Sequence, residues 1–436
     1  MAIAAPNNIA KPSGQVRGGL ESVSRLHDRT AMFAVLVLFC SLPFIQLGIS
    51  YEISVQYLAF IVVAITVRKR LPLREWVIWA FVFVAMLLGL FWHLDAEALF
   101  GAILRNSREA LGVLLIICAA RNVSWSVPDR FLRFLLNSTI VGLFILTLAQ
   151  FVTYTVLKKP QFFMPAAFFI TGQDTIPDHW LEFGKLNGFL ASVRVSATYS
   201  EPSYLSFVCL CLATIVRRAS LDKTTTWVLL SLSLGTIALS KSASGVFLFV
   251  LFMAYSYGRE FITPGRLLVL SGTLSAALLI AAGALDFNPL ERIMDVTDPR
   301  VEPSGYIRLV MPLQHVATVL TESPFGVPWS ELYNFFLQRT GDYSVIGPVE
   351  KSTGMWIGQD NGFLNLFIEF GWAGFVVIGG IVGAIRDRFV LLFLLFVTQF
   401  NGSPFGPDKV ALICLALSCR PATVSMRPNI VRPGMN

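Results

Sequence analysis

Four charged residues stand where long polar segments of the sequence meet apolar ones. Arg194 and Arg308 each precede an apolar segment, and the planar guanidinium of arginine binds oxyanions through paired, charge-assisted hydrogen bonds. Glu201 and Asp360 stand just before apolar runs, where a carboxylate next to a hydroxyl could accept its proton as a general base. Each residue also has a structural explanation: the arginines could pair with acids of the polar segments, Glu201 could stabilise a helix N-terminus, and Asp360 could cap one.

Three neighbouring residues are secondary candidates. His315 follows Arg308 by seven residues, or two helical turns, so the two side chains could share a face, although a structural histidine is the simpler explanation. Asn361 directly follows Asp360. Glu369 lies inside an apolar run, where a carboxylate is either functional or paired with a basic neighbour that holds helices together. The remaining histidines have no metal-ligand spacing and no Asp-x-Asp pair occurs, so we expect neither a metal nor another cofactor.

Composition places these residues in a membrane protein. Hydrophobic residues make up 55% of the chain and charged residues 14%, against roughly 45–50% and about 25% in soluble domains. The apolar residues form blocks that approach the ~20 residues needed to cross ~30 Å of hydrocarbon, and such blocks must be helical so that their backbone groups bond internally. We therefore expect an all-α fold, a polytopic transmembrane helix bundle of about 12 spans. The fourth block is interrupted by Arg105, Arg108 and Glu109, so the count could be off by one or two.

Two long polar segments divide these predicted spans into three groups. The spans are expected at residues 31–49, 53–67, 76–94, 98–120, 135–157, 203–216, 227–239, 245–257, 267–285, 362–385, 389–400 and 410–419. The resulting division has tails at 1–30 and 420–436, helix groups at 31–157, 203–285 and 362–419, and long loops at 158–202 and 286–361. Lysine and arginine gather on one set of short connections and on both tails, which predicts cytoplasmic tails and two long periplasmic loops. Loops of this length are usually functional or disordered, and their aromatic residues and charges of both signs favour folded loops.

Short motifs follow one another in a fixed order along the second half of the chain. They are Arg194 upstream of Glu201-Pro202-Ser203, a serine-rich turn at 240–245, Arg308 before Ser323-Pro324-Phe325-Gly326, and Asn361 followed by Leu364 and by Glu369, Gly371 and Gly374. In this order they resemble the bacterial O-antigen ligase and polymerase superfamily, in particular the Wzy-type exopolysaccharide polymerases, with the xanthan-type enzymes as a narrower guess. The resemblance covers about residues 194–374. It rests on the ordered set at predicted loop–helix junctions, because no single motif is specific.

The resemblance implies a GT-C-like membrane glycosyltransferase. Such an enzyme would polymerise undecaprenyl-pyrophosphate-linked oligosaccharide repeat units into exopolysaccharide at the periplasmic face of the inner membrane. Arg194 and Arg308 would hold the pyrophosphate and offset charge on the leaving group, while Glu201 or Asp360 would take the proton of the acceptor hydroxyl. The implied partners are the lipid-linked oligosaccharide, membrane lipid, and chain-length regulator and export proteins, with no nucleic acid.

Two other functions stay open at this point. A ligase of the same superfamily would transfer finished glycan to another acceptor, but such ligases usually carry histidine where this chain has Asp360. A transporter or flippase for polysaccharide precursors would also show about twelve spans with both tails inside. Against it, the connection at 68–75 lacks the Gly and Asp of the major facilitator signature, and the two halves of the chain are not similar.

Overall fold

The computed structural model describes most of the apolar blocks and the ends of the long polar segments. The described residues are 29–45, 55–66, 72–88, 90, 96–121, 125–155, 197–199, 202–219, 221–261, 310–328, 331–332, 335–336, 361–385, 387–400, 403 and 405–421. Every structural statement below refers to these residues. The predicted span at 267–285 lies outside them.

The described chain is helical apart from one pair of three-residue strands, so the predicted all-α class is confirmed for this part of the protein. After an N-terminal helix at Arg29–Phe44, the helices are α2 (Val55–Thr66), α3 (Leu73–Leu88), α5 (Ala96–Arg121), α6 (Asp129–Thr155), α9 (Pro202–Arg218), α10 (Lys223–Leu239), α11 (Ala243–Phe261), α15 (Met311–Glu322), α18 (Gly362–Phe370), α19 (Ala373–Ala384), α20 (Arg388–Val397) and α21 (Pro407–Ser418). Strand β1 (Trp125–Val127) pairs in parallel with β2 (Cys419–Pro421).

Most predicted spans coincide with a helix to within a few residues, but the one at 362–385 is wrong in its continuity. It consists of two helices, α18 and α19, separated at Gly371, where φ is 55°. Judged by length and composition, the stretch Asp129–Thr153 of α6 is the one helix in the described part that could cross a membrane, and five further apolar helices there are shorter. The twelve-span count therefore stays a prediction.

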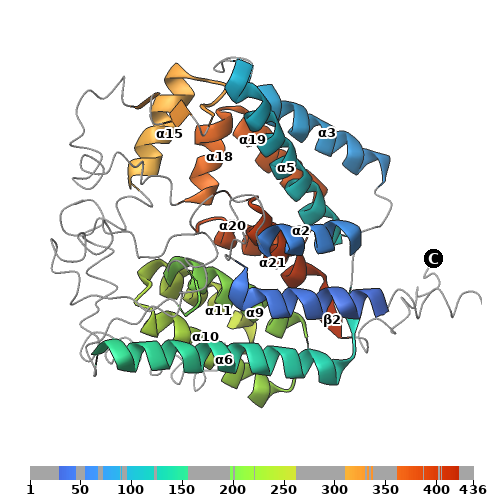
Figure 1. The fold of residues 1–436 in the computed structure, drawn as a ribbon, viewed down its shortest axis with the longest axis vertical. Helices are drawn as coiled ribbons and strands as arrows, with labels where there is room; N and C mark the ends of the chain where they lie inside the picture. The colour runs from blue at the N-terminus through green and yellow to red at the C-terminus, as the bar shows by residue number, and fades with distance from the viewer. Residues whose placement is uncertain are drawn as a thin grey trace, which may run out of the picture.

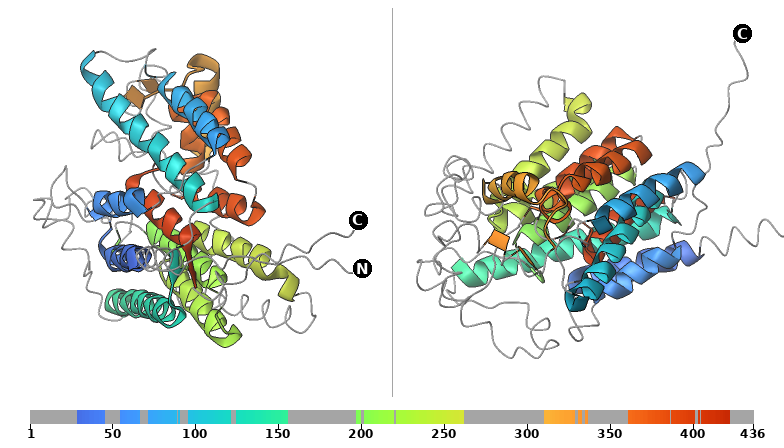
Figure 2. Two further views of the ribbon diagram at one scale, coloured as in Figure 1. Left: turned by 90° about the vertical axis from the view of Figure 1, so that its right-hand side faces the viewer. Right: turned by 90° about the horizontal axis from the view of Figure 1, so that it is seen from above.

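The helices pack in two groups connected by a buried helix (Figure 1). Helices α3, α5, α15, α18 and α19 form the upper group, and α6, α9, α10 and α11 the lower, with α2, α20 and α21 between them. Helix α3 packs on α19 and α5, and α10 packs on α6 and α9. Helix α21 contacts α5, α2 and α9 and so joins the two groups, which the side view in Figure 2 also separates.

The apolar core is large, and a second small core lies apart from it. Nearly every residue of α21 is buried. The small core is formed by residues of α15, of α18 and of the segment that follows α15, namely Val319, Val327, Leu332, Phe335, Phe336 and Ile368. Large apolar side chains also cover the outside of whole helices, as on α3, where the exposed ones are Leu73, Trp76, Val77, Phe81, Val84 and Leu88.

Candidate functional site

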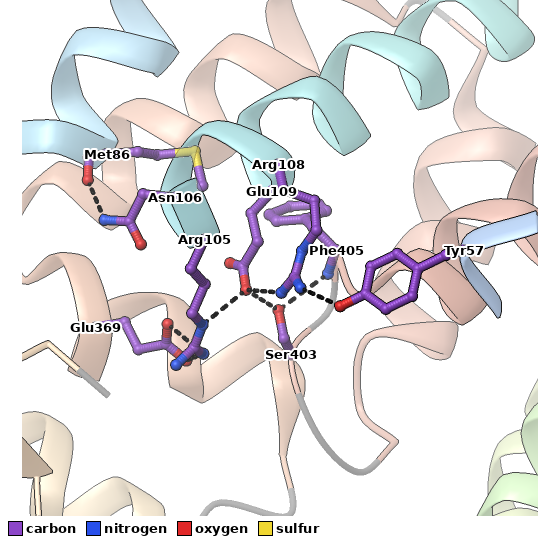
Figure 3. A network of polar contacts seen from close by, with 9 residues as sticks. All are labelled: Tyr57, Met86, Arg105, Asn106, Arg108, Glu109, Glu369, Ser403 and Phe405. Atoms are coloured by element: carbon purple, nitrogen blue, oxygen red, sulfur yellow. Dashed lines mark hydrogen bonds and ion pairs between the residues drawn. The ribbon is translucent and has the colours of Figure 1, made fainter. Parts of the chain in front are cut away.

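A network of charged side chains lies between α5 and α18, inside the upper group (Figure 3). Arg105 Nη2 donates to both carboxylate oxygens of Glu369, at 3.0 and 2.9 Å, and Arg105 Nε donates to Glu109 Oε1 at 3.3 Å. Arg105 and Glu109 are four residues apart on α5 and so share a face, whereas Glu369 comes from α18. One guanidinium therefore joins two carboxylates from different helices.

A second arginine balances the charge of this network. Arg108 Nη1 donates to the hydroxyl of Tyr57 on α2 at 3.0 Å, and its Nη2 lies 3.9 Å from Glu109 Oε1. The Glu109 and Glu369 side chains are 1% and 5% exposed, while those of Arg105 and Arg108 are 22% and 30% exposed. Buried carboxylates require such partners, because an unpaired buried charge is strongly destabilising. Two arginines and two glutamates together leave the network neutral.

Two further hydrogen bonds tie the network to neighbouring elements. Ser403, between α20 and α21, donates its hydroxyl to Glu109 Oε1 at 2.9 Å. Asn106 donates its side-chain amide to the backbone oxygen of Met86 on α3 at 2.7 Å. The charged face of α5 is thereby connected to α2, α3, α18 and the α20–α21 connection.

Asn361 caps the N-terminus of α18. Its Oδ1 accepts hydrogen bonds from the backbone amides of Phe363 and Leu364, both at 3.1 Å. These amides have no partner within the helix, so the cap satisfies them. The Asn361 side-chain amide in turn donates to Gln399 Oε1 at 3.1 Å. The predicted cap at this corner is thus made by Asn361, the residue after Asp360.

Backbone hydrogen bonds fix the same corner against the end of α20. Gly362 N donates to the Phe400 oxygen at 3.2 Å and Phe363 N to the Thr398 oxygen at 2.7 Å. Phe400 also accepts from the buried Lys409 Nζ at 3.2 Å. The start of α18 therefore has a defined position relative to the α20–α21 connection.

The last two motifs of the sequence lie together at the break between α18 and α19. Trp372 N donates to the Pro324 oxygen, and Val327 N donates to the Ile368 oxygen, each at 2.9 Å. The Pro-Phe-Gly turn after α15 is thus hydrogen-bonded on both sides to the end of α18 and the start of α19.

Two glycines make this joint possible. A Cβ at Gly371 would overlap the Pro324 oxygen and lie 2.5 Å from Gly326 N, and a Cβ at Gly326 would overlap the Glu369 oxygen. Both glycines have positive φ, 88° at Gly326 and 55° at Gly371, where residues with a side chain are disfavoured. The glycines of these motifs therefore have a packing role.

The serine-rich motif packs on α9, the helix that begins at the end of the first motif. A Cβ at Gly245, in the serine-rich motif, would overlap Ser206 on α9, three residues after Ser203 of the first motif. Upstream of α9, Gln150 on α6 exchanges two hydrogen bonds of 2.8 Å with the backbone of Ala197. The serine-rich motif is therefore joined to α9, and the last two motifs are joined to each other beside α18.

The predicted site residues divide into placed and unplaced ones. His315 is buried on α15 and stacks on Phe336, with ring centroids 3.9 Å apart. Burial lowers the pKa of His315 to about 4, so the imidazole is neutral at pH 7 and belongs to the small core. Asn361 and Glu369 have the positions given above. The other four lie outside the described residues: Arg194, Glu201, Arg308 and Asp360.

Part of the charged network could be predicted from the sequence, but its extent could not. The Arg105–Glu109 spacing inside an apolar block is visible in the sequence, and pairing with a base is one of the two explanations offered above for Glu369. Tyr57 and Ser403 of the network were missed, as was Gln399, the partner of Asn361, because single hydroxyl and amide residues carry no pattern of their own.

These features define a class of protein. An all-helical chain with large apolar residues outside and charged groups paired inside has the distribution typical of helical membrane proteins. The sequence profile of the WcaD colanic acid polymerase family matches residues 29–421. The chain therefore belongs to this family, which confirms the resemblance to the Wzy-type polysaccharide polymerases. No curated protein and no solved structure matches the chain.

Proposed function

We propose that the protein polymerises undecaprenyl-pyrophosphate-linked oligosaccharide repeat units into exopolysaccharide. The family match over residues 29–421 carries this proposal, since the family is one of polysaccharide polymerases. The ordered motifs support it independently, and the Pro-Phe-Gly turn and the last motif are hydrogen-bonded to each other.

The proposed setting is the bacterial inner membrane, with about twelve spans and both tails in the cytoplasm. Apolar side chains on the outside of α3 and other helices support a lipid environment. The distribution of lysine and arginine supports the orientation. In this arrangement residues 158–202 and 286–361 lie at the periplasmic face, where the reaction would take place.

The proposed reaction is a glycosyl transfer with a lipid pyrophosphate as leaving group. The hydroxyl oxygen of an incoming repeat unit forms a bond to the anomeric carbon of the growing chain, and the bond between that carbon and the pyrophosphate oxygen breaks. Glu201 or Asp360 takes the hydroxyl proton. Arg194 and Arg308 hold the departing undecaprenyl pyrophosphate and offset its charge. Asp360 directly precedes Asn361, whose side chain caps α18, and this supports the choice of Asp360, since a general base is a positioned side chain.

A direct test uses purified protein in liposomes, supplied only with a lipid-pyrophosphate-linked repeat unit. We expect a ladder of lengthening lipid-linked glycans that is lost in Arg194→Ala and Arg308→Ala. Arg74→Ala is a suitable control, because Arg74 is exposed on α3 and falls on the predicted cytoplasmic side. If the repeat unit stays single, the proposal fails. Glycan appearing on an added acceptor would then indicate a ligase, and movement across the liposome membrane without chemistry a flippase.

A further inference from the structure

We propose that Arg105 is a positioning residue for the reaction, holding α18 so that the Asp360–Asn361 corner stands correctly at its N-terminus. The inference rests on the proposed function, in which Asp360 is a candidate base. Arg105 itself contacts no reacting group in this proposal. It acts through Glu369, at the opposite end of α18 from the corner.

The contacts around α18 form a closed circuit. Arg105 on α5 bonds to Glu369 near the C-terminal end of α18. At the N-terminal end, Asn361 bonds to Gln399, and the Gly362 and Phe363 amides bond to the end of α20. The α20–α21 connection then returns to α5 through Ser403 and Glu109, which also bonds to Arg105. Each end of α18 is therefore fixed relative to the same charged face of α5.

The Arg105–Glu369 pair is better suited to orienting α18 than to raising the stability of the folded protein. Buried ion pairs contribute little stability relative to apolar residues of the same volume. Their hydrogen bonds are directional, however, and the Arg105 guanidinium is held from two sides, by Glu369 through Nη2 and by Glu109 through Nε, which fixes its orientation as well as its distance. Eight of the nine residues of α18 are buried, but apolar packing is non-directional, so a directional contact adds a constraint on the tilt of the helix. The charged pair supplies this constraint.

The distance between Glu369 and Asn361 sets the expected loss of rate. Asn361 and Glu369 are eight residues apart, which is about 12 Å along a helix at 1.5 Å per residue. A tilt of about 5° would then move Asn361 by about 1 Å, and a displacement of that size at a reacting group can lower a rate by about 100-fold. Loss of the pair should therefore lower kcat by roughly 10- to 100-fold, while KM for the lipid-linked repeat unit changes little.

The decisive variant replaces the pair without leaving a buried charge unbalanced. In Arg105→Met/Glu369→Leu one positive and one negative charge are removed together, and Arg108 and Glu109 remain to balance each other. The matched control is Arg121→Met/Glu75→Leu, which removes another ion pair of α5. This pair connects α5 to α3 and not to α18, and its side chains are 27% and 3% exposed. Arg105→Lys serves as a second variant, which keeps the charge and loses the planar fork.

Two measurements are made on each purified variant: polymer formation in liposomes, giving kcat and KM, and hydrogen exchange of the Gly362 and Phe363 amides. We expect the Arg105→Met/Glu369→Leu variant to show faster exchange at these amides and a lower kcat than the unmodified protein. Arg105→Lys should be intermediate in both measurements. The control Arg121→Met/Glu75→Leu should behave like the unmodified protein. Unchanged exchange with a lower kcat would overturn the proposal, because Arg105 would then act on the reaction directly. Faster exchange with an unchanged kcat would also overturn it. If the unmodified protein makes no polymer, the proposed function fails instead, and the exchange result still reports whether the pair fixes α18.

Discussion

Substitution of Gly371 by alanine should disrupt the joint between the Pro-Phe-Gly turn and the α18–α19 break. Gly371 has φ 55° and ψ −134°, a combination that residues with a side chain rarely adopt. The added Cβ would also overlap the Pro324 oxygen. Backbone strain and steric overlap therefore act in the same direction.

The magnitude follows from these contributions. Holding a residue with a side chain in a sparsely populated backbone region costs about 1–3 kcal/mol. Movement of the Pro324 turn away from the Cβ would stretch the hydrogen bonds of Trp372 N to the Pro324 oxygen and of Val327 N to the Ile368 oxygen, each contributing about 0.5–1.5 kcal/mol. We expect Gly371→Ala to lower the free energy of unfolding by about 3–5 kcal/mol.

Thermal unfolding of the purified protein in detergent would measure this loss, with Gly379→Ala as the matched control. Gly379 lies within α19, and a Cβ there meets nothing within 4 Å. Alanine should therefore be neutral or stabilising at Gly379 by up to about 1 kcal/mol, the difference in helix propensity. If Gly371→Ala were as stable as Gly379→Ala, the joint would not depend on the glycine and the reasoning would be refuted.

Three further predictions test other parts of the structure. Gly245→Ala should lower stability by about 1–3 kcal/mol through overlap with Ser206, and Ser206→Gly in the same chain should recover part of the loss; additive losses in thermal unfolding would contradict this. Because burial lowers the pKa of His315 to about 4 from 6.5, its contribution to stability is complete above pH 6.5. It should be lost between pH 6.5 and pH 4, by about 3 kcal/mol at 1.36 kcal/mol per unit, and His315→Phe should remove this part of the pH dependence of unfolding. Gln150→Leu should cost about 2–5 kcal/mol in urea unfolding, because it leaves the buried N–H and C=O of Ala197 unpaired, whereas a loss below 1 kcal/mol would show that other groups replace the amide.

The positions of the helices could be predicted because they depend on local sequence. A long apolar run with few helix-breaking residues is most stable as a helix, and α21 and α10 begin and end close to the predicted blocks. The break at Gly371 could not be predicted in this way. The apolar run continues through it, and the Pro324 turn that accepts a hydrogen bond at the break comes from a distant part of the chain. Local sequence therefore predicts where a helix forms, while the position of this interruption depends on tertiary contacts.

The charged network shows the same limit. The Arg105–Glu109 spacing predicts a shared helix face, but the bond from Arg105 to Glu369 joins residues 264 positions apart. A single sequence contains no signal that would select this carboxylate over the others. The sequence could indicate that Glu369 needs a partner inside an apolar segment, but only the fold, which places Glu369 within reach of the Arg105 side chain, identifies that partner.

The joints between motifs change how the motifs should be interpreted. Gly245, Gly326 and Gly371 have a sufficient explanation in the close approach of neighbouring segments, without any part in chemistry. Loss of activity on replacing them would therefore report disrupted packing. The charged residues Arg194, Glu201, Arg308 and Asp360 of these motifs lie outside the described residues, and the proposed function assigns them to the chemistry. Polymer formation and protein stability measured together should then separate two groups: the glycines, where both fall, and the charged residues, where activity alone falls, namely Arg194, Glu201, Arg308 and Asp360.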